Sequence, residues 1–567
     1  MHARALASLL LLPMLCLVLA GCSGDGLFFP QKTVSTDGGD VPDADDTEEP
    51  EPTPTPDTTT SLGTWLAAFG DDRVESAARE GSQQYVARLK LQRDGSVVSG
   101  TGKVFRFYES GTRAYRELAY RVSGTISGDD VTVTEESYTG GTVYDALSWR
   151  LRIASRYMVG MYVGEDFDGD VVRSGHAVWH KQSSADLSTY PWITAFTDAY
   201  GRVNWPRRDR TGVLLFNEDP ATGALTGAGS FVEQRDGATP FEVGFNVTSG
   251  YASDLAAEFT LGELELLTSP MDWYAFYTAG YLNSVMVSAY AQFDVNGAMA
   301  RHGTATWYTA PDAGPDAIHA NWMVAFSDAN PPGDGQYRDY LARVLLKPQE
   351  DNTVTGSGTL YILKDGEGRS ESVSVEDGII VGSRVTLDLR VKSSREIWTW
   401  DLRLGKKIMP GSYQHFDGAD RFLTRGAAVW RGGGKTTVQA MAGTWAAAYF
   451  DSYEVDSDPT TQFALVTINE PPEEGSEDEN VLTGFGALRY GTGATGRRLF
   501  NLIDSEIEDF DIAWTWRSPD LFGDTTWRLH RATGSILVGV YFNETSAGRL
   551  ESQGHGLWFR TSMSDAF

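Results

Sequence analysis

Cysteine is nearly absent from this sequence. Cys16 and Cys22 are the only two in 567 residues, and both lie in the N-terminal region. We expect Cys16 to be removed with a cleaved signal, so that the mature chain has no second cysteine with which to form an intramolecular disulfide. The stability of the folded domains must therefore come from packed cores.

Basic residues are scarce relative to acidic ones. The chain has 47 lysines and arginines against 77 aspartates and glutamates, which gives a formal net charge of −30. This excess of negative charge repels phosphates and excludes nucleic acid as a partner. Divalent cations are the ionic partners that such a chain favours.

Long hydrophobic runs are absent beyond the N-terminus. The one long run covers residues 5–20, follows Arg4 and contains Pro13. It is shorter than the roughly 20 residues that a membrane-spanning helix needs. The small residues directly before Cys22 are typical of the cleavage site of a secretion signal.

The sequence LAGC at residues 19–22 resembles the lipobox of bacterial lipoproteins. The resemblance covers residues 1–22 and implies a signal peptide at 1–21, with Cys22 as the lipidation site. Diacylglycerol on the Cys22 sulfur and a fatty acyl chain such as palmitate on its amino group would anchor the chain stably. Ser23 rather than Asp follows the cysteine, which by the sorting rule of the family implies the outer membrane of the cell envelope. The alternative is an ordinary secretory signal, but no better small-residue cleavage site follows.

The segment after the signal has almost nothing to bury. Residues 22–61 are rich in Asp, Glu, Thr and Pro. This composition predicts a disordered acidic tether, which proline and charge repulsion extend away from the membrane.

Four motifs recur four times in the same order along the rest of the chain. The motif W-x-x-A-[FY]-x-D begins at Trp65, Trp192, Trp322 and Trp445. The motif [LV]-[ST]-G-x-G has its first glycine at Gly100, Gly227, Gly356 and Gly484. A tryptophan with a downstream [GS]-x-Y follows, ending at Tyr162, Tyr290, Tyr413 and Tyr541, and G-x-x-x-W closes each copy at Trp179, Trp307, Trp430 and Trp558. This order predicts four tandem repeats at 62–188, 189–311, 312–440 and 441–567.

The local pattern within each repeat is that of β-strands. Apolar residues alternate with polar ones in YVARLKLQR, from Tyr85, and in RVTLDLRVK, from Arg384. The landmarks divide each copy into about eight strands in roughly 110 residues, which fits a small closed antiparallel barrel. We therefore expect an all-β protein of four eight-stranded up-and-down barrels, with β-sandwiches as the alternative.

The order of landmarks is similar to that of avidin-like and lipocalin-like barrels. It consists of G-T-W, then [LV]-[ST]-G, a tryptophan strand, G-x-Y, and a last strand ending in Trp. The avidin-like family places a ligand-binding Asn and Ser two and six residues after the first tryptophan. Ala67 and Asp71 occupy these positions in the first copy, so biotin binding is not expected.

The repeats separate residues that serve folding from residues that serve function. A residue present in all four copies solves a problem that the copies share, so 12 of the 16 tryptophans are predicted core residues. Asp71 and its counterparts are predicted to accept backbone N–H groups. The tryptophans outside the framework are Trp205, Trp398, Trp514 and Trp516.

Trp205 gives the first candidate site. It precedes Arg207 and Arg208 in a predicted loop, and an exposed aromatic ring beside cations can stack a sugar or bind an acidic partner. The alternative is a loop that plugs the end of a barrel.

The hairpin GEDFDGDVVRSG gives a second candidate, a calcium site. Asp166, Asp168 and Asp170 alternate there, and hard oxygen ligands at such spacing suit calcium. The twelfth-position glutamate of an EF-hand is missing, because Ala177 stands there. The alternative is a solvated turn. The solvated turn is the favoured interpretation, so no cofactor is expected, and calcium is the one candidate that the sequence offers.

Known catalytic patterns are absent. The sequence contains no G-x-S-x-G and no H-E-x-x-H. His176 and His180 share one face of a strand, opposite Trp179, where we expect them to be exposed rather than to bind zinc.

These patterns favour a non-catalytic, lipid-anchored envelope protein. Its partners would be the membrane, through acylated Cys22, and a small hydrophobic molecule, a glycan or an envelope protein. The alternatives are a structural spacer or adhesin, with filled barrels, and an envelope glycan hydrolase, with paired carboxylates in one cleft.

Overall fold

A computed structural model describes most of the chain after the predicted tether. The described residues are 59–74, 82–108, 115–137, 146–165, 170–201, 207–263, 270–279, 283–311, 314–328, 338–454, 460–470, 481–490, 498–517 and 523–561. The predicted signal peptide, Cys22 and nearly all of the tether lie outside them. Thr58–Phe567 form one compact unit. Among the described residues, no helix combines the length and apolar character needed to cross a bilayer.

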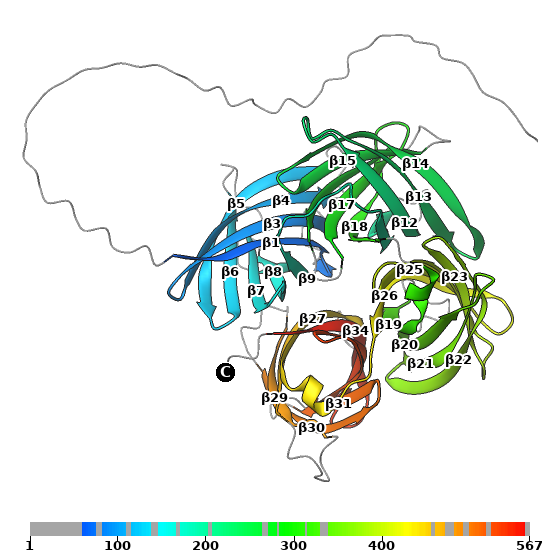
Figure 1. Cartoon of the computed structure of the whole chain (residues 1–567). Helices are drawn as coiled ribbons and strands as arrows, with labels where there is room; N and C mark the ends of the chain where they lie inside the picture. The colour runs from blue at the N-terminus through cyan, green and yellow to red at the C-terminus, as the bar shows by residue number, and fades with distance from the viewer. Residues whose placement is uncertain are drawn as a thin grey trace, which may run out of the picture. The chain divides into compact units, whose positions relative to one another are not determined.

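Four antiparallel eight-stranded β-barrels follow one another along this unit (Figure 1). The last main strand of each sheet pairs with the first, at β1–β9, β10–β18, β19–β26 and β27–β34. This closure confirms the predicted barrels and excludes the sandwich alternative, because a sandwich leaves two separate sheets.

Barrels 1 and 2 each carry one additional two-residue strand. The strands of barrel 1 are β1 (Thr60–Gly70), β2 (Arg73–Val74), β3 (Gln83–Asp94), β4 (Val97–Tyr108), β5 (Tyr115–Ser127), β6 (Asp130–Ser137), β7 (Ala146–Ala154), β8 (Tyr157–Glu165) and β9 (Val171–Lys181). Those of barrel 2 are β10 (Trp192–Thr197), β11 (Tyr200–Gly201), β12 (Asp209–Glu218), β13 (Leu225–Arg235), β14 (Ala238–Ser253), β15 (Ala256–Glu263), β16 (Met271–Thr278), β17 (Val285–Phe293) and β18 (Met299–Thr309). The short strands β2 and β11 pair with β9 and β18.

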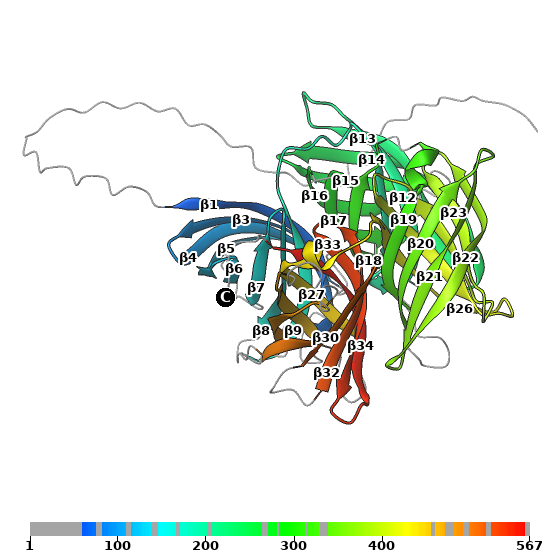
Figure 2. The same cartoon turned by 60° about the horizontal axis from the view of Figure 1, so that its bottom comes forward.

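Barrels 3 and 4 follow the same order and are each preceded by a short helix. Barrel 3 has η1 (Pro315–Ile318), β19 (Ala320–Ser327), β20 (Arg338–Pro348), β21 (Thr353–Lys364), β22 (Glu367–Val381), β23 (Arg384–Val391), β24 (Ile397–Arg403), β25 (Ile408–Phe416) and β26 (Phe422–Gly433). Barrel 4 has α1 (Val438–Met441), β27 (Gly443–Glu454), β28 (Thr461–Ile468), β29 (Gly484–Tyr490), β30 (Arg498–Glu508), β31 (Asp511–Arg517), β32 (Gly523–Thr533), β33 (Ile536–Thr545) and β34 (Leu550–Arg560). Figure 2 shows the strands of barrel 3 from the side.

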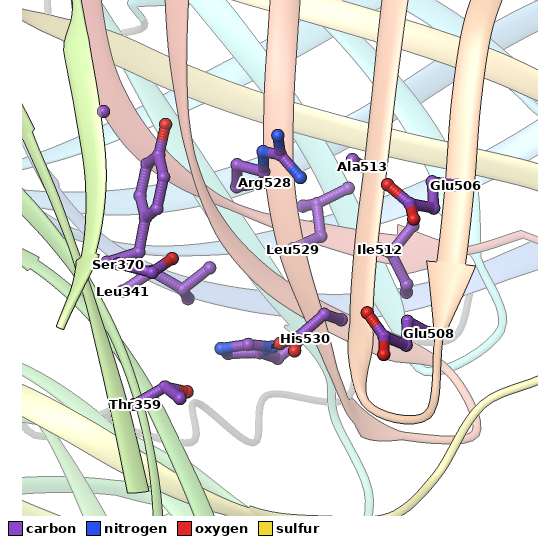
Figure 3. Close-up of a pocket in the computed structure, with 13 residues that line it drawn as sticks. Leu341, Thr359, Ser370, Glu506, Glu508, Ile512, Ala513, Arg528, Leu529 and His530 are labelled. Atoms are coloured by element: carbon purple, nitrogen blue, oxygen red, sulfur yellow. Dashed lines mark ion pairs between the residues drawn. The ribbon is translucent and has the colours of Figure 1, made fainter. Parts of the chain in front are cut away.

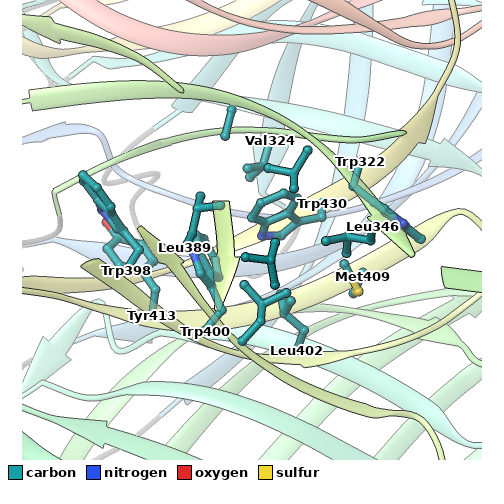
Figure 4. Packing of buried hydrophobic residues seen from close by; sticks show 14 of the residues in the cluster. Trp322, Val324, Leu346, Leu389, Trp398, Trp400, Leu402, Met409, Tyr413 and Trp430 are labelled. Carbon is teal, nitrogen blue, oxygen red and sulfur yellow. The ribbon is translucent and has the colours of Figure 1, made fainter. Parts of the chain in front are cut away.

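Aromatic side chains fill the interior of each barrel. All twelve framework tryptophans are buried, as predicted, and barrel 3 shows the packing around Trp322, Trp400 and Trp430 (Figure 4). The non-framework tryptophans Trp398 and Trp514 are buried in the cores as well, with Trp516 beside Trp514. Those three are therefore core residues rather than surface binding residues.

The segment before a barrel is fixed by the first framework tryptophan. The Nε1 of Trp192, Trp322 and Trp445 donates to the carbonyl of Leu187, Ile318 and Met441, each at 2.8 Å. These three carbonyl-bearing residues are buried in their core clusters. The tryptophan thus holds an apolar plug at one end of its barrel.

The first glycine of [LV]-[ST]-G-x-G permits close approach of the neighbouring strand. A Cβ atom added at any of these four glycines would lie much closer to a backbone carbonyl oxygen than a van der Waals contact allows. The oxygens are those of Lys90 (2.3 Å), Leu215 (2.3 Å), Leu345 (2.5 Å) and Thr467 (2.2 Å). The predicted close backbone approach is confirmed.

The framework aspartate links the first motif to the third. Asp71, Asp198 and Asp451 accept a backbone N–H from Gln83 (2.8 Å), Arg208 (2.8 Å) and Thr460 (3.2 Å). The same aspartates accept the hydroxyl of the [GS]-x-Y tyrosine, from Tyr162 (2.8 Å), Tyr290 (2.5 Å) and Tyr541 (2.6 Å). These carboxylates therefore serve folding, as predicted, by joining the end of the first strand to strands on either side of it in the barrel.

The barrels pack against one another in a closed cycle. In each interface the first two long strands of one barrel lie against the last strands of the next. Barrels 1, 2 and 3 contact the last three strands of the following barrel, and barrel 4 contacts β8 and β9 of barrel 1. Two apolar clusters on the outer faces of the barrels form these contacts. A head-to-tail contact that returns to its start makes a closed ring.

Equivalent polar contacts mark three of these interfaces. In each contact, one residue lies near the start of the second long strand of a barrel. Its partner belongs to the next barrel and directly precedes the glycine of the G-x-x-x-W motif. The pairs are Asp209–Arg425, Asp339–Gln553 (2.7 Å) and Thr461–Ser174 (3.3 Å). The last pair joins barrel 4 to barrel 1 and closes the ring.

Candidate binding site

The residues that the sequence singled out do not converge on one site. Asp166, Asp168 and Trp205 lie outside the described residues. Asp170 is exposed on the approach to β9. No group of three or more His, Cys, Asp or Glu side chains in the described part of the chain could hold a metal ion.

The two predicted arginines directly precede β12 and make different contacts. Arg208 forms an ion pair with Glu233 and is about a fifth exposed. The Arg207 carbonyl accepts a hydrogen bond from the Arg425 side chain. Arg207 itself is exposed. Its carbonyl therefore contributes to the barrel 2–3 junction, whereas Arg208 forms its ion pair within barrel 2.

Inside each barrel, the described side chains form a core cluster. Described residues also line three cavities, and all three lie between barrels. The largest has a volume of about 690 Å³, within the usual range of roughly 300–1,000 Å³ for ligand sites. All four barrels contribute to its wall. We call it the axial cavity.

Equivalent residue pairs from the four barrels surround the axial cavity. The two residues of each pair lie opposite each other on the last two strands of their barrel. The second residue directly follows the closing framework tryptophan. The pairs are Tyr157–His180, Val285–Tyr308, Ile408–Arg431 and Ile536–Phe559. Ring closure therefore creates this cavity, because no single barrel supplies more than a part of its wall.

The wall of the axial cavity combines apolar surface with an excess of positive charge. Apolar side chains come from barrels 1, 2 and 4, and Ile408 comes from barrel 3. The cations are Arg156, Lys181, Lys407, Arg431 and Arg560, against Asp72 as the one lining carboxylate. This local balance is opposite to the net charge of −30 of the chain.

His176 and His180 share a face opposite Trp179, as predicted, but they line this cavity instead of standing on an open surface. Burial and the nearby Arg431 guanidinium lower the pKa of His180 to about 4, so its imidazole is neutral at pH 7. Burial opposes the charge on His176, yet the Asp72 carboxylate, 2.6 Å from Nδ1, raises its pKa above the ordinary value.

A second cavity, of about 360 Å³, lies between the outer faces of barrels 3 and 4 (Figure 3). Glu506, Glu508 and Asp511 bring carboxylates to it, as a glycan hydrolase would require. Asp511 lies 3.0 Å from His530 Nδ1. Burial opposes the charge on Asp511, but this hydrogen bond and the charge of His530 lower its pKa. A general acid needs a raised pKa, so Asp511 does not fit that role.

Comparisons with known proteins leave the function open. No family model and no curated protein matches the chain. Among solved structures, it is similar to a DUF3598-family protein of unknown function from Nostoc punctiforme, with 11% identity over 44% of this chain and 96% of that chain and a TM-score of 0.15.

Two transferrin-binding protein B structures are also similar. A mutant of this vaccine antigen from Haemophilus parasuis shares 8% identity, and intact Ap-TbpB, with its N and C lobes, shares 9%. Each comparison covers 91% of this chain and 98% of the other, with a TM-score of 0.18. At these values the likeness gives no argument about a ligand or partner.

The axial cavity was not predicted from the sequence. The available signal was the residue after each closing tryptophan, where His180, Tyr308, Arg431 and Phe559 follow. Alternation along the strand turns this position outward, yet Tyr308 and Phe559 place a large aromatic ring there in two of the four copies. A large ring on an outward position indicates that another surface covers it.

Proposed function

We propose that this protein is a lipid-anchored, non-catalytic binding protein of the bacterial outer membrane, and that its ligand occupies the axial cavity. The observation that carries the proposal is the convergence of equivalent residue pairs from four barrels on one cavity of about 690 Å³. Concave sites with a mostly apolar wall and a few placed polar groups are the usual sites of small ligands.

The sequence motif at residues 19–22 supports the membrane anchor. Acylation of Cys22 and an extended acidic tether over residues 22–61 would hold the ring at a distance from the bilayer. The framework aspartates support a non-catalytic role, because buried hydrogen bonds engage them in folding.

A structural spacer is the second candidate function. The filled lumens and the apolar clusters between barrels favour it, because they make a rigid unit. It differs from the binding proposal in predicting that the axial cavity holds no ligand.

Native mass spectrometry separates the two functions. The mature chain carrying Cys22→Ser, exported without lipidation from a bacterial cell, is expected to retain one added mass per chain because the ring has one axial cavity. Tyr308→Trp should reduce this occupancy by filling the cavity, whereas Tyr251→Trp, on an exposed position of barrel 2, should not. A bare polypeptide mass after mild release would favour the spacer, and four equal added masses would indicate luminal sites.

A further inference from the structure

We propose that the axial cavity takes an amphiphilic anion, in which a carboxylate or phosphate group is attached to a hydrocarbon chain. This inference rests on the proposed function, since it names the chemical class of the ligand in the same cavity. Two features of the wall carry it: cations that lack carboxylate partners, and an apolar surface beside them.

None of the five lining cations has a carboxylate partner among the described residues, although Lys181 and Arg560 lie over the rings of Trp65 and Trp445. Arg156 and Lys407 are exposed at the edge of the cavity, and Arg431 is half-buried on β26. Arg425 at the interface of barrels 2 and 3, by contrast, is paired with Asp209 and Asp236. In a chain with 77 acidic residues, unpaired cations gathered around one cavity point to a negative charge supplied by a ligand.

The one lining carboxylate is already engaged. Asp72 Oδ2 accepts the Thr461 hydroxyl at 3.0 Å and lies 2.6 Å from His176 Nδ1. These contacts hold Asp72 at the junction of barrels 1 and 4. The Asp72 carboxylate therefore interacts with His176 and Thr461. The cations of barrel 3 remain available to bind the ligand.

The rest of the wall suits a hydrocarbon chain. Val285, Val287, Ile536 and Phe559 bring apolar side chains from barrels 2 and 4. All four are at least nine-tenths buried. Burial of a CH₂ group on such a surface contributes about 0.8 kcal/mol, whereas the head group would face Lys407 and Arg431 on barrel 3.

His180 lines the cavity near Arg431. Burial and the Arg431 charge lower the pKa of His180 to about 4, so its imidazole is neutral near pH 7 and offers a hydrogen-bonding group, while the lysines and arginines of the wall supply the positive charge. The cavity thus combines apolar surface from barrels 2 and 4 with cations that include Lys407 and Arg431 of barrel 3, and this combination is the complement of an amphiphilic anion.

Titration of the mature Cys22→Ser chain, delipidated by mild organic extraction and refolded, tests the ligand class. The probes are dodecanoate, dodecyl phosphate and the neutral dodecanol, measured by isothermal titration calorimetry at pH 7.5. At least one anionic probe is expected to bind with one site per chain, at least about tenfold more tightly than dodecanol, because a charged hydrogen bond contributes more than that ratio requires. Tighter binding of dodecanoate would indicate a fatty acid, and tighter binding of dodecyl phosphate would indicate a phospholipid.

The variant Lys407→Gln/Arg431→Gln is the critical comparison. It should weaken binding of the anionic probe by about tenfold or more and leave dodecanol unchanged, since it removes charge without removing the apolar wall. Lys407→Arg/Arg431→Lys should retain anion binding. The matched control is Lys347→Gln/Lys392→Gln, which removes two exposed cations of barrel 3 outside the cavity. Thermal unfolding of all four proteins reports their folding.

Equal affinity for dodecanoate, dodecyl phosphate and dodecanol would overturn the proposed ligand class, as would anion binding that Lys407→Gln/Arg431→Gln leaves unchanged. If none of the probes binds while native mass spectrometry still detects one retained mass, the ligand class is wrong and the binding function stands. If none binds and no mass is retained, both proposals are wrong.

Discussion

Glu135 occupies a position that the other barrels fill with large apolar side chains. It lies two residues after Val133, which pairs with the framework Trp149, and the equivalent residues are Leu261, Leu389 and Trp516. Its side chain is buried inside barrel 1 and accepts a hydrogen bond from Trp149 Nε1 at 2.8 Å. Burial raises the pKa of Glu135 to about 7, although the Arg106 charge and the Trp149 bond lower it.

This raised pKa predicts a specific pH dependence of stability. The unfolded value is 4.5, so between pH 4.5 and about 7 the folded state binds the proton more tightly than the unfolded state. The contribution of Glu135 is therefore full below pH 4.5 and is lost as the pH rises through about 7. Glu135→Gln removes this titrating group. We therefore expect the free energy of unfolding of Glu135→Gln, relative to that of the wild type, to be higher at pH 8 than at pH 4.5 by on the order of 2–3 kcal/mol.

Urea unfolding followed across this pH range measures the difference. Glu367→Gln is the matched control, because Glu367 is exposed on β22. A difference between Glu135→Gln and wild type that stays constant from pH 4.5 to 8 would show that Glu135 does not titrate in this window.

At the scale of the strand, the paired glycines of [LV]-[ST]-G-x-G fix how closely two neighbouring strands can lie. In barrel 3, a Cβ on the second glycine, Gly358, would lie 1.9 Å from the Arg343 carbonyl oxygen. Because that oxygen belongs to the backbone of β20, the clash can be relieved only by moving a strand. These glycines therefore serve the packing of neighbouring strands and do not form part of a binding site.

Gly358→Ala should therefore destabilise barrel 3, by about 1–3 kcal/mol, the usual cost of overpacking. Gly314→Ala is the control in the same repeat, since a Cβ there meets no atom within 4 Å and its φ is −58°. The control should change the free energy of unfolding by less than about 0.5 kcal/mol. Equal unfolding midpoints for the two variants would refute the packing role of Gly358.

Strands and their inward faces could be predicted from the sequence because they depend on short-range alternation. Val385, Leu387, Leu389 and Val391 alternate in the sequence and all lie in the core of barrel 3. The two-residue strands β2 and β11 could not be predicted, because each consists of a brief pairing with a distant strand. The prediction that His176 and His180 are exposed was wrong. The alternation of residues along their strand places both histidines on the outer face of barrel 1, but a neighbouring barrel covers that face.

At the scale of the whole molecule, the four copies form one closed assembly. Repetition of folding residues made four barrels predictable. The ring was not predictable, because its contacts use outward positions at which the copies differ: Arg425, Gln553 and Ser174 are equivalent in the repeat but unlike in chemistry. Each copy has been specialised for its own neighbour, and the axial cavity results from that arrangement.

The closure between barrels 4 and 1 is the central claim, and engineered disulfides test it most directly. Both native cysteines precede the folded unit, so Ser174→Cys/Thr461→Cys in a Cys22→Ser background introduces a single new pair. The native hydroxyl oxygens are 3.3 Å apart, and side chains at such a distance can form a disulfide with little movement. Thr211→Cys/Ser412→Cys, with oxygens 2.7 Å apart between barrels 2 and 3, is the positive control, and Ser230→Cys/Thr461→Cys is the negative control.

Mass spectrometry of the oxidised proteins reads out the bond. A closed ring predicts quantitative cross-linking of Ser174→Cys/Thr461→Cys, matching the positive control. Cross-linking of the barrel 2–3 pair without cross-linking of the barrel 4–1 pair would mean an open array of barrels, and the axial cavity would then not exist.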